Sequence, residues 1–170
     1  MDLLWAPWRT KYIQSFKDKE NIKSNTCFLC DSIKNKEEFH EKLIVAKSSH
    51  CFVILNKFPY NGGHLLIAPY RHTGDILDIL DEEIIDMNNL TKISIKILNE
   101  LSNPLGYNIG YNIGRVAGAG LPEHLHLHVI PRWNGDTSFI SIISDTKVIS
   151  QALEETQVIL SEKFKEFGKY

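Results

Sequence analysis

The stretch HLHLHVIP, residues 124–131, alternates histidine with apolar residues. Successive side chains of a β-strand point to opposite faces, so residues two apart share a face. The stretch therefore predicts a strand that anchors its apolar side chains in a core and lines the other face with imidazoles. The three histidines are His124, His126 and His128. A strand whose only role is to pack in a core does not need a row of histidines, so this segment is also expected to contain functional residues.

The rest of the chain mixes strand-like and helical patterns without a strict alternation. Apolar residues recur at helical spacing over residues 81–101, and Asn103-Pro104 follows as an end signal. Segments rich in β-formers are separated by turn residues, most clearly at 56–63. The predicted strands are 51–55, 64–68, 107–113 and 124–131, and a second amphipathic helix is predicted over about 145–167. This order predicts an α+β domain with an antiparallel sheet.

The composition is typical of one compact soluble domain, expected to span residues 1–170. The chain has 170 residues, 43% of them hydrophobic, and a formal net charge of −2. Proteins that bind nucleic acid normally show a basic excess, so nucleic acid is not an expected partner. No stretch approaches the roughly 20 apolar residues that span a membrane, and the N-terminus lacks the pattern of a signal peptide. We expect a cytoplasmic protein that does not bind membranes.

A row of imidazoles is well suited to phosphate chemistry. A neutral imidazole attacks phosphorus well near pH 7, because its unperturbed pKa is about 6.5. Neighbouring imidazoles can orient the attacking ring and donate protons to phosphate oxygens or to a leaving group. Two other interpretations are a pure metal site, since imidazole is a common ligand, and polar residues without function on a solvent face. Catalysis on a nucleotide is the interpretation we favour.

The histidine stretch, preceded by RVAGAG at 115–120, closely resembles the signature of the histidine-triad (HIT) superfamily. The resemblance continues upstream through residues 54–80 and downstream through PRWNGDTSF at 131–139. With LWAPWR near the N-terminus, these flanks are similar to the bacterial branch of diadenosine tetraphosphate phosphorylases and hydrolases. The motif-bearing region covers about residues 3–140. The resemblance implies a HIT-like fold, with a five-stranded antiparallel sheet, a long helix and a C-terminal helix, in a protein that forms homodimers.

The resemblance also implies roles for single residues. His126 is the implied nucleophile, His128 contacts the phosphate and assists the leaving group, and His124 orients the cluster. His64, in a Gly-His pair, is similar to the family's upstream catalytic-site histidine near the triad. Asn56 is implied to contact the ribose. The implied phosphate-side residues are Asn112 and the loop Gly118-Ala119-Gly120-Leu121, with Arg115 at the start of the loop. Small residues in such a loop let main-chain N–H groups approach an anion closely.

Cys27 and Cys30 form a CxxC pair, which supplies two thiolates but does not close a tetrahedral zinc site. Redox chemistry is disfavoured because no βαβ pattern surrounds the pair. The candidate third and fourth ligands are His40, His50, His72 and His124. The resemblance implies a structural zinc held by Cys27, Cys30, His72 and His124. The alternative is a pair of thiols without metal, and Cys51 is expected to be a core residue.

Other basic and aromatic residues are candidates for contacts with a ligand. Arg forks match phosphate geometry, and the candidates to reach polyphosphate oxygens are Lys57, Arg71, Arg115 and Arg132. Packing is expected for the tryptophans rather than base stacking or a dimer contact; these are Trp5, Trp8 and Trp133.

The predicted activity is cleavage of a dinucleoside polyphosphate such as diadenosine tetraphosphate through a nucleotidyl-histidine intermediate, which water or inorganic phosphate then resolves. A phosphoramidase or acyl-nucleotide hydrolase would use the same residues on smaller leaving groups. A zinc-stabilised nucleotide-binding scaffold with little turnover is the alternative from a different class.

Overall fold

A computed structural model of the protein describes residues 27–34, 43–136 and 152–167. The helices are α2 (Phe28–Lys34), α3 (Asp81–Ser102) and α5 (Leu153–Glu166), with short 3₁₀ helices η3 (Ile76–Asp78) and η4 (Arg115–Ala117). The strands are β1 (Ile44–Lys47), β2 (Cys51–Leu55), β3 (Leu65–Pro69), β4 (Gly106–Tyr111) and β5 (Leu127–Arg132). They form one five-stranded antiparallel sheet in the order β1-β2-β3-β5-β4, which confirms the predicted α+β class and the five-stranded sheet.

The centre of the sheet is the β2–β3 hairpin and its neighbour β5. All five residues of β2 and all five of β3 are buried, so these strands form the middle of the core. Leu66 pairs with His128, and Ile67 pairs with Leu127, which fixes the register of β5 against β3. The β4 strand pairs with the other side of β5 and is the edge of the sheet in the described part of the chain.

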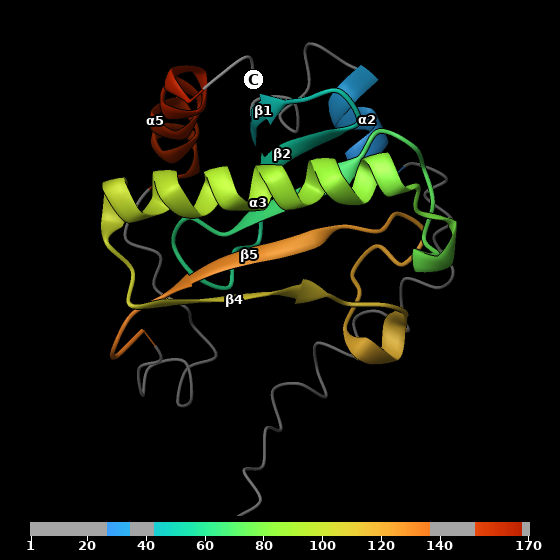
Figure 1. Cartoon of the computed structure of the whole chain (residues 1–170). Helices are drawn as coiled ribbons and strands as arrows, with labels where there is room; N and C mark the ends of the chain where they lie inside the picture. Colours follow the sequence, from blue (N-terminus) through green and yellow to red (C-terminus); the bar gives the residue numbers. More distant parts are fainter. Residues whose placement is uncertain (1–26, 35–42, 137–151, 168–170) are drawn as a thin grey trace, which may run out of the picture.

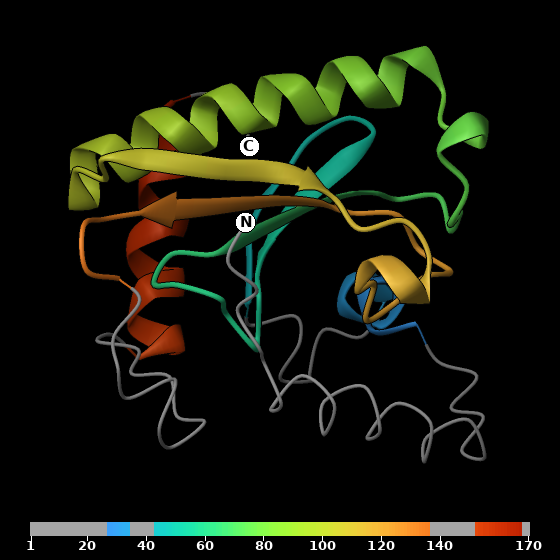
Figure 2. The same cartoon turned by 90° about the horizontal axis from the view of Figure 1, so that it is seen from below.

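The long helix α3 crosses one face of the sheet (Figure 1), and its apolar side forms the core with β2, β3 and β5. Met87, Leu90 and Ile97 are buried at helical spacing, as the sequence pattern predicted. Ile84 and Leu101, which belong to the same pattern, are exposed at the two ends because the helix is longer than the sheet it covers. Viewed from below, α2 and η4 lie on the side of the sheet away from α3 (Figure 2).

The C-terminal helix α5 packs beside β1, with Leu160 and Phe164 buried in the core. The predicted helix over about 145–167 is therefore confirmed from Leu153, and residues 145–151 lie outside the described residues. No helix in the described ranges is both long and apolar enough to cross a membrane.

The predicted strand 124–131 differs from the observed one at its start. Strand β5 begins at Leu127, so His124 lies in a bend and His126 in the irregular segment that precedes the strand. Pairing with β3 stops at Leu127, and the segment before it is held instead by the Leu125 N–H, which donates to the Thr73 carbonyl at 2.7 Å. The predicted strand 51–55 has the bounds of β2, whereas the bounds of the predicted strands 64–68 and 107–113 shift by one or two residues.

Candidate active site and metal centre

Two thiols and two imidazoles meet where α2 approaches the ends of β3 and β5. Cys27 immediately precedes α2 and Cys30 lies in its first turn, so their three-residue spacing puts both thiols on one side of the helix. His72 follows β3, and His124 precedes β5. The ligand atoms of these four residues all lie within 4.8 Å of one another. The arrangement brings together the four residues that the family resemblance implied as a ligand set.

The distances within this cluster fit a tetrahedral ion. His124 Nδ1 lies 3.2 Å from Cys27 Sγ and 3.5 Å from Cys30 Sγ, and His72 Nδ1 lies 3.4 Å from Cys30 Sγ. Zn–S and Zn–N bonds of about 2.3 and 2.0 Å at tetrahedral angles give an S···N separation of about 3.5 Å. The donor set is chemically that of a closed, structural zinc site. These three separations are those expected between ligands of one tetrahedral ion, so the residues fit a metal ion.

Hydrogen bonding turns the correct nitrogen of His124 toward the thiols. Its Nε2 lies 2.9 Å from the main-chain carbonyl oxygen of Pro69, which can only accept, so Nε2 carries the hydrogen. Nδ1 is left with a lone pair that points at Cys27 and Cys30. Burial also lowers the pKa of His124 to about 4, which keeps the ring neutral, the form that binds a metal. Without a metal, burial raises the pKa of the Cys27 thiol to about 11.

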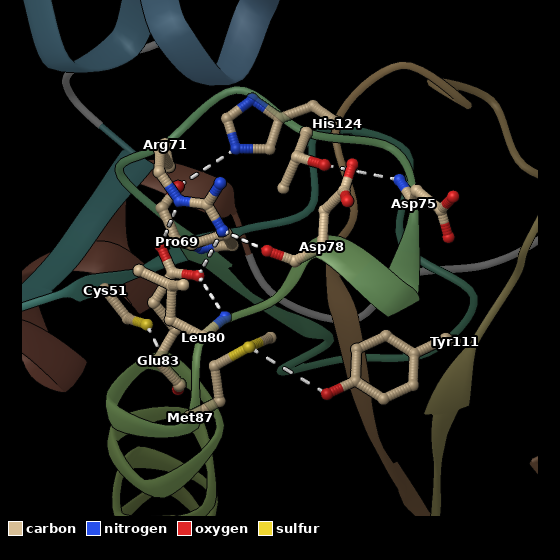
Figure 3. Close-up of polar contacts among 11 residues, drawn as sticks. Cys51, Pro69, Arg71, Asp75, Asp78, Leu80, Glu83, Met87, Tyr111 and His124 are labelled. Atoms are coloured by element: carbon tan, nitrogen blue, oxygen red, sulfur yellow. Dashed lines mark hydrogen bonds and ion pairs between the residues drawn. The ribbon is translucent and has the colours of Figure 1, made fainter.

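The segment from Pro69 to Gly74 is fixed to its surroundings on two sides. On one side, Arg71 forms a two-pronged ion pair with Glu83 in the first turn of α3, with Nε–Oε1 and Nη2–Oε2 distances of 3.0 and 2.8 Å (Figure 3). Glu83 also accepts the Leu80 N–H, and Arg71 Nη2 donates to the Asp78 carbonyl. On the other side, Gly74 packs so tightly that a Cβ there would clash with the Pro122 carbonyl oxygen. The helix α3 and the segment before His124 therefore both position the loop that carries His72.

His126 has the hydrogen-bonding pattern of a nucleophile. Its Nδ1 lies 2.8 Å from the main-chain carbonyl oxygen of His124, so Nδ1 carries the hydrogen and Nε2 keeps the lone pair. Burial lowers the pKa of His126, so the ring is neutral near pH 7. The His126 ring lies beside that of His128, with centroids 4.9 Å apart, whereas the His124 ring lies against His72 at 5.2 Å. The three histidines thus divide between two sites rather than sharing one face.

His64 and His128 are linked in a chain whose proton positions are fixed by a main-chain donor. The Tyr60 N–H donates to His64 Nδ1 at 3.0 Å, so the hydrogen of neutral His64 is on Nε2. That nitrogen lies 2.9 Å from His128 Nδ1 and donates to it. Neutral His128 then carries its own hydrogen on Nε2, which lies 3.4 Å from the Asn112 amide nitrogen; both atoms are donors in this arrangement, so they do not bond to each other and can donate to a common acceptor. Burial, and secondarily the charge of His126, lowers the pKa of His128 to about 4.

The loop between β4 and β5 borders this chain of histidines. Asn112 follows β4, and Gly118, at a φ of +92°, ends η4. The Gly118 and Ala119 N–H groups donate to Arg115 and Gly114 carbonyls within the loop. Arg115 itself forms an exposed 3.4 Å ion pair with Glu123.

Several basic and aromatic candidates have structural partners. Arg132 pairs with Asp136 through Nε–Oδ2 at 2.6 Å and also donates to Asn108, and the Arg71 guanidinium is held by Glu83. Trp133 donates its indole N–H to the Ser102 carbonyl, in agreement with the packing role expected for it. Trp5, Trp8 and His40 lie outside the described residues.

Sequence reasoning did not single out four groups that shape the site. The Pro69 carbonyl and the Tyr60 N–H act through the main chain, and no side-chain pattern marks them. Asn61 is buried and donates to the Pro131 carbonyl at 3.0 Å and to Asp136 at 2.8 Å, which ties the loop before His64 to the end of β5. The fourth group is the Glu83 carboxylate. Of the four, only Glu83 could have been found from the sequence, because a glutamate three residues after the residue that precedes a helix commonly caps that helix.

A five-stranded antiparallel sheet with paired imidazoles at His64 and His128 and a nucleophile-like His126 defines a histidine-triad type of protein. Comparisons with known proteins agree. The HIT domain model matches residues 37–135. The chain is 37% identical over 163 residues to the AP-4-A phosphorylase of Mycobacterium tuberculosis, covering 95% of this chain and 83% of that protein. The chain belongs to the HIT family, as its sequence resemblance implied.

Further relatives support this assignment. An uncharacterized HIT-like protein of Methanocaldococcus jannaschii is 34% identical over 93 residues, which cover 55% of this chain and 70% of that protein. A solved structure of a Zn-bound histidine triad family protein from Mycobacterium smegmatis matches with a TM-score of 0.67 at 26% identity, covering 85% of this chain and 96% of that chain.

Proposed function

We propose that the protein is a nucleotidyl-transferring enzyme that cleaves dinucleoside polyphosphates, with diadenosine tetraphosphate as the model substrate. The observation that carries the proposal is the orientation of His126, whose Nδ1–H is held by the His124 carbonyl so that Nε2 presents its lone pair. In the first step a bond forms between His126 Nε2 and the α-phosphorus, and the bond from that phosphorus to the bridging oxygen breaks. The similarity to an AP-4-A phosphorylase over most of the chain supports this substrate class.

His128 assists the leaving group in this proposal by hydrogen bonding. The chain from the Tyr60 N–H through His64 places a hydrogen on His128 Nε2, and this N–H donates to the departing phosphate oxygen, which leaves as an anion. In the second step an unprotonated oxygen of inorganic phosphate, or water that loses a proton to solvent, attacks the phosphorus. The bond from that phosphorus to His126 Nε2 then breaks and the neutral His126 ring is restored.

We assign the remaining nucleotide contacts to the border of this cluster. Asn112 lies next to His128 Nε2 and is positioned to hold a phosphate oxygen beside it. Because the Gly118 and Ala119 N–H groups donate within the loop, we assign the anion contacts to the Gly120 and Leu121 N–H groups, with Gly118 shaping the turn and Arg115 adding positive charge. Asn56, which ends the β2 side of the hairpin next to His64, is assigned to the ribose.

The Cys27, Cys30, His72 and His124 cluster is proposed to bind one structural Zn²⁺. The metal would fix the segment before β5, and it takes part in no chemical step. His124 contributes its ring to the cluster and its main-chain carbonyl to His126, so one residue orients both sites. Metal analysis of the purified protein tests this proposal: about one zinc per chain is expected, and a metal-free protein with full activity and unchanged stability contradicts it.

We further propose that the chain is a single domain, active in the cytoplasm, and that it forms a homodimer through β4. This strand is an edge of the sheet in the described part of the chain, and Ile109 on it is 46% exposed. Edge strands offer unpaired main-chain groups to a second chain. Light scattering after size exclusion is expected to give twice the 19.5 kDa chain mass, and Ile109→Lys is expected to give monomers.

The activity is tested by incubating the protein with diadenosine tetraphosphate with and without inorganic phosphate. ADP plus ATP formed only with phosphate indicates a phosphorylase, and AMP plus ATP indicates a hydrolase. His126→Ala is expected to abolish either activity, and His64→Ala to reduce it in part. Absence of products from the wild-type protein contradicts the proposal, and cleavage restricted to adenosine phosphoramidate would favour the smaller-substrate alternative.

A further inference from the structure

An aromatic surface lies beside the histidine cluster on the loop that joins β2 to β3. Phe58 is 77% exposed and Tyr60 is 44% exposed, although both lie between buried strands. The Lys57 ammonium lies 5.8 Å from the centroid of the Phe58 ring. Their exposed rings offer flat apolar area to a ligand bound at the histidine cluster.

The loop that carries these rings is rigid because most of its polar groups are bonded. The Asn56 side chain accepts the Phe58 N–H at 3.0 Å, and the His64 N–H donates to the Asn61 carbonyl at 3.2 Å. Asn61 is in turn fixed to the end of β5 by its bond to the Pro131 carbonyl. A preorganised aromatic surface binds a flat ligand at a lower entropic cost than a flexible one.

Tyr60 connects this surface to the chemistry. Its ring stacks on His64 at 5.0 Å and on His128 at 6.0 Å, with interplanar angles of 28° and 19°. Tyr60 therefore covers the two imidazoles with its ring, and Phe58 lies two residues before it on the same loop. In the proposed mechanism the leaving nucleotide departs on the side of His128, because the His128 Nε2–H donates a hydrogen bond to the departing oxygen.

We propose that Phe58 and Tyr60 form the binding surface for the second nucleoside, the one that leaves with the polyphosphate, and that Lys57 attracts the phosphates that precede it. Each base has a π-face, so aromatic stacking recognises any purine or pyrimidine without a fixed set of hydrogen bonds. The positive charge of Lys57 complements the polyphosphate between the two nucleosides. This inference rests on the proposed function and adds the residues that favour dinucleoside over mononucleoside substrates.

The test compares two substrates that differ only in the second nucleoside: diadenosine tetraphosphate and adenosine 5′-tetraphosphate. Phe58→Ala is the main variant, because Phe58 is exposed and makes no stacking contact with the imidazoles among the described residues. Loss of one stacking platform is expected to lower kcat/KM for diadenosine tetraphosphate about tenfold. The value for adenosine 5′-tetraphosphate is expected to change less than twofold, and Phe58→Trp is expected to restore the first value.

Ile85→Ala is the matched control, because Ile85 is a 61% exposed apolar residue on α3, which covers the opposite face of the sheet. It is expected to leave kcat/KM for both substrates unchanged. An equal fall for both substrates in Phe58→Ala, or no fall for either, overturns the inference while the proposed function stands. A wild-type protein that cleaves neither substrate overturns the proposed function and this inference with it.

Discussion

Replacing Glu83 by alanine tests whether the first turn of α3 positions the metal site. Glu83 is 4% exposed and accepts hydrogen bonds from Arg71 and from the Leu80 N–H. Through Arg71 it holds the loop whose Pro69 carbonyl orients His124 (Figure 3). Removing the carboxylate frees the Arg71 guanidinium, leaves the Leu80 N–H without its acceptor, and lets this loop move.

The magnitude follows from the bonds that are lost. A charge-assisted pair of this kind and one helix-capping bond contribute about 2–3 kcal/mol together, after a discount because the Arg71 side chain is 43% exposed. For a chain of this size the melting temperature is expected to fall by about 4–10 °C. Metal affinity, measured by competition with a chromophoric chelator, is expected to fall about tenfold, the usual effect of disturbing the groups that orient a ligand.

Glu166→Ala is the control, because it breaks an exposed ion pair between Lys163 and Glu166 on α5. Its melting temperature and metal affinity are expected to match the wild type within error. If Glu83→Ala keeps both the wild-type stability and the wild-type metal affinity, the ion pair does not position the loop. If the stability falls and the affinity does not, the pair stabilises α3 alone.

The same variant carries a pH signature. The Arg71 guanidinium beside Glu83 lowers the pKa of that carboxyl below its ordinary value of 4.5. The stabilisation by Glu83 is therefore complete above about pH 4.5 and is lost as the pH falls through the lower pKa of the folded state. In metal-free protein, the difference in the free energy of unfolding between wild type and Glu83→Ala is expected to shrink in that acidic range.

Three further predictions address neighbouring features. Gly74→Ala is expected to lower the free energy of unfolding by about 1–3 kcal/mol and to weaken metal binding, because the added Cβ meets the Pro122 carbonyl oxygen. Gly62→Ala is the control, because a Cβ there has nothing within 4 Å; its melting temperature and its metal affinity by competition are expected to match the wild type. Cys30→Ser is expected to bind less than one metal ion per chain by elemental analysis, because one thiolate ligand is lost. Cys51→Ala is expected to keep the metal, because Cys51 is buried in the core and is not part of the ligand cluster. Asn61→Ala is expected to lower kcat more than it raises KM, since it releases the loop that places Tyr60 and His64; unchanged kcat would contradict that role.

Much of the fold was predictable because the central strands are short apolar runs rich in β-formers and bounded by turn residues. Residues 51–55 were predicted as a strand and form β2, and the long helix was predicted to start at Asp81, where α3 begins. The apolar spacing of α3 also indicated the side that packs on the sheet. The assignment to the HIT family is confirmed, and the grouping of CxxC with His72 and His124 agrees with what the resemblance implied.

The division of the histidines between two sites was not predictable from periodicity. Alternation placed His124 on the same face as His126 and His128, yet its ring turns toward the thiols because β5 starts only at Leu127. That rotation depends on the Pro69 carbonyl, a main-chain group that any residue could supply. The partner of Arg71 was equally hidden, since nothing in the sequence distinguishes an arginine that binds a phosphate from one that binds Glu83.

The separation of roles at His124 would allow the proposed metal and the proposed nucleophile to lie two residues apart without competing. A metal at the cysteines would use the Nδ1 lone pair of the ring, whereas His126 depends on the main-chain carbonyl of His124. Fixing the ring fixes the main chain to which it is attached, so an ion there would steady the acceptor that keeps the hydrogen of His126 on Nδ1. In the proposed mechanism, the lone pair of His126 Nε2 would thereby be kept available by an interaction that does not reach the reacting atoms.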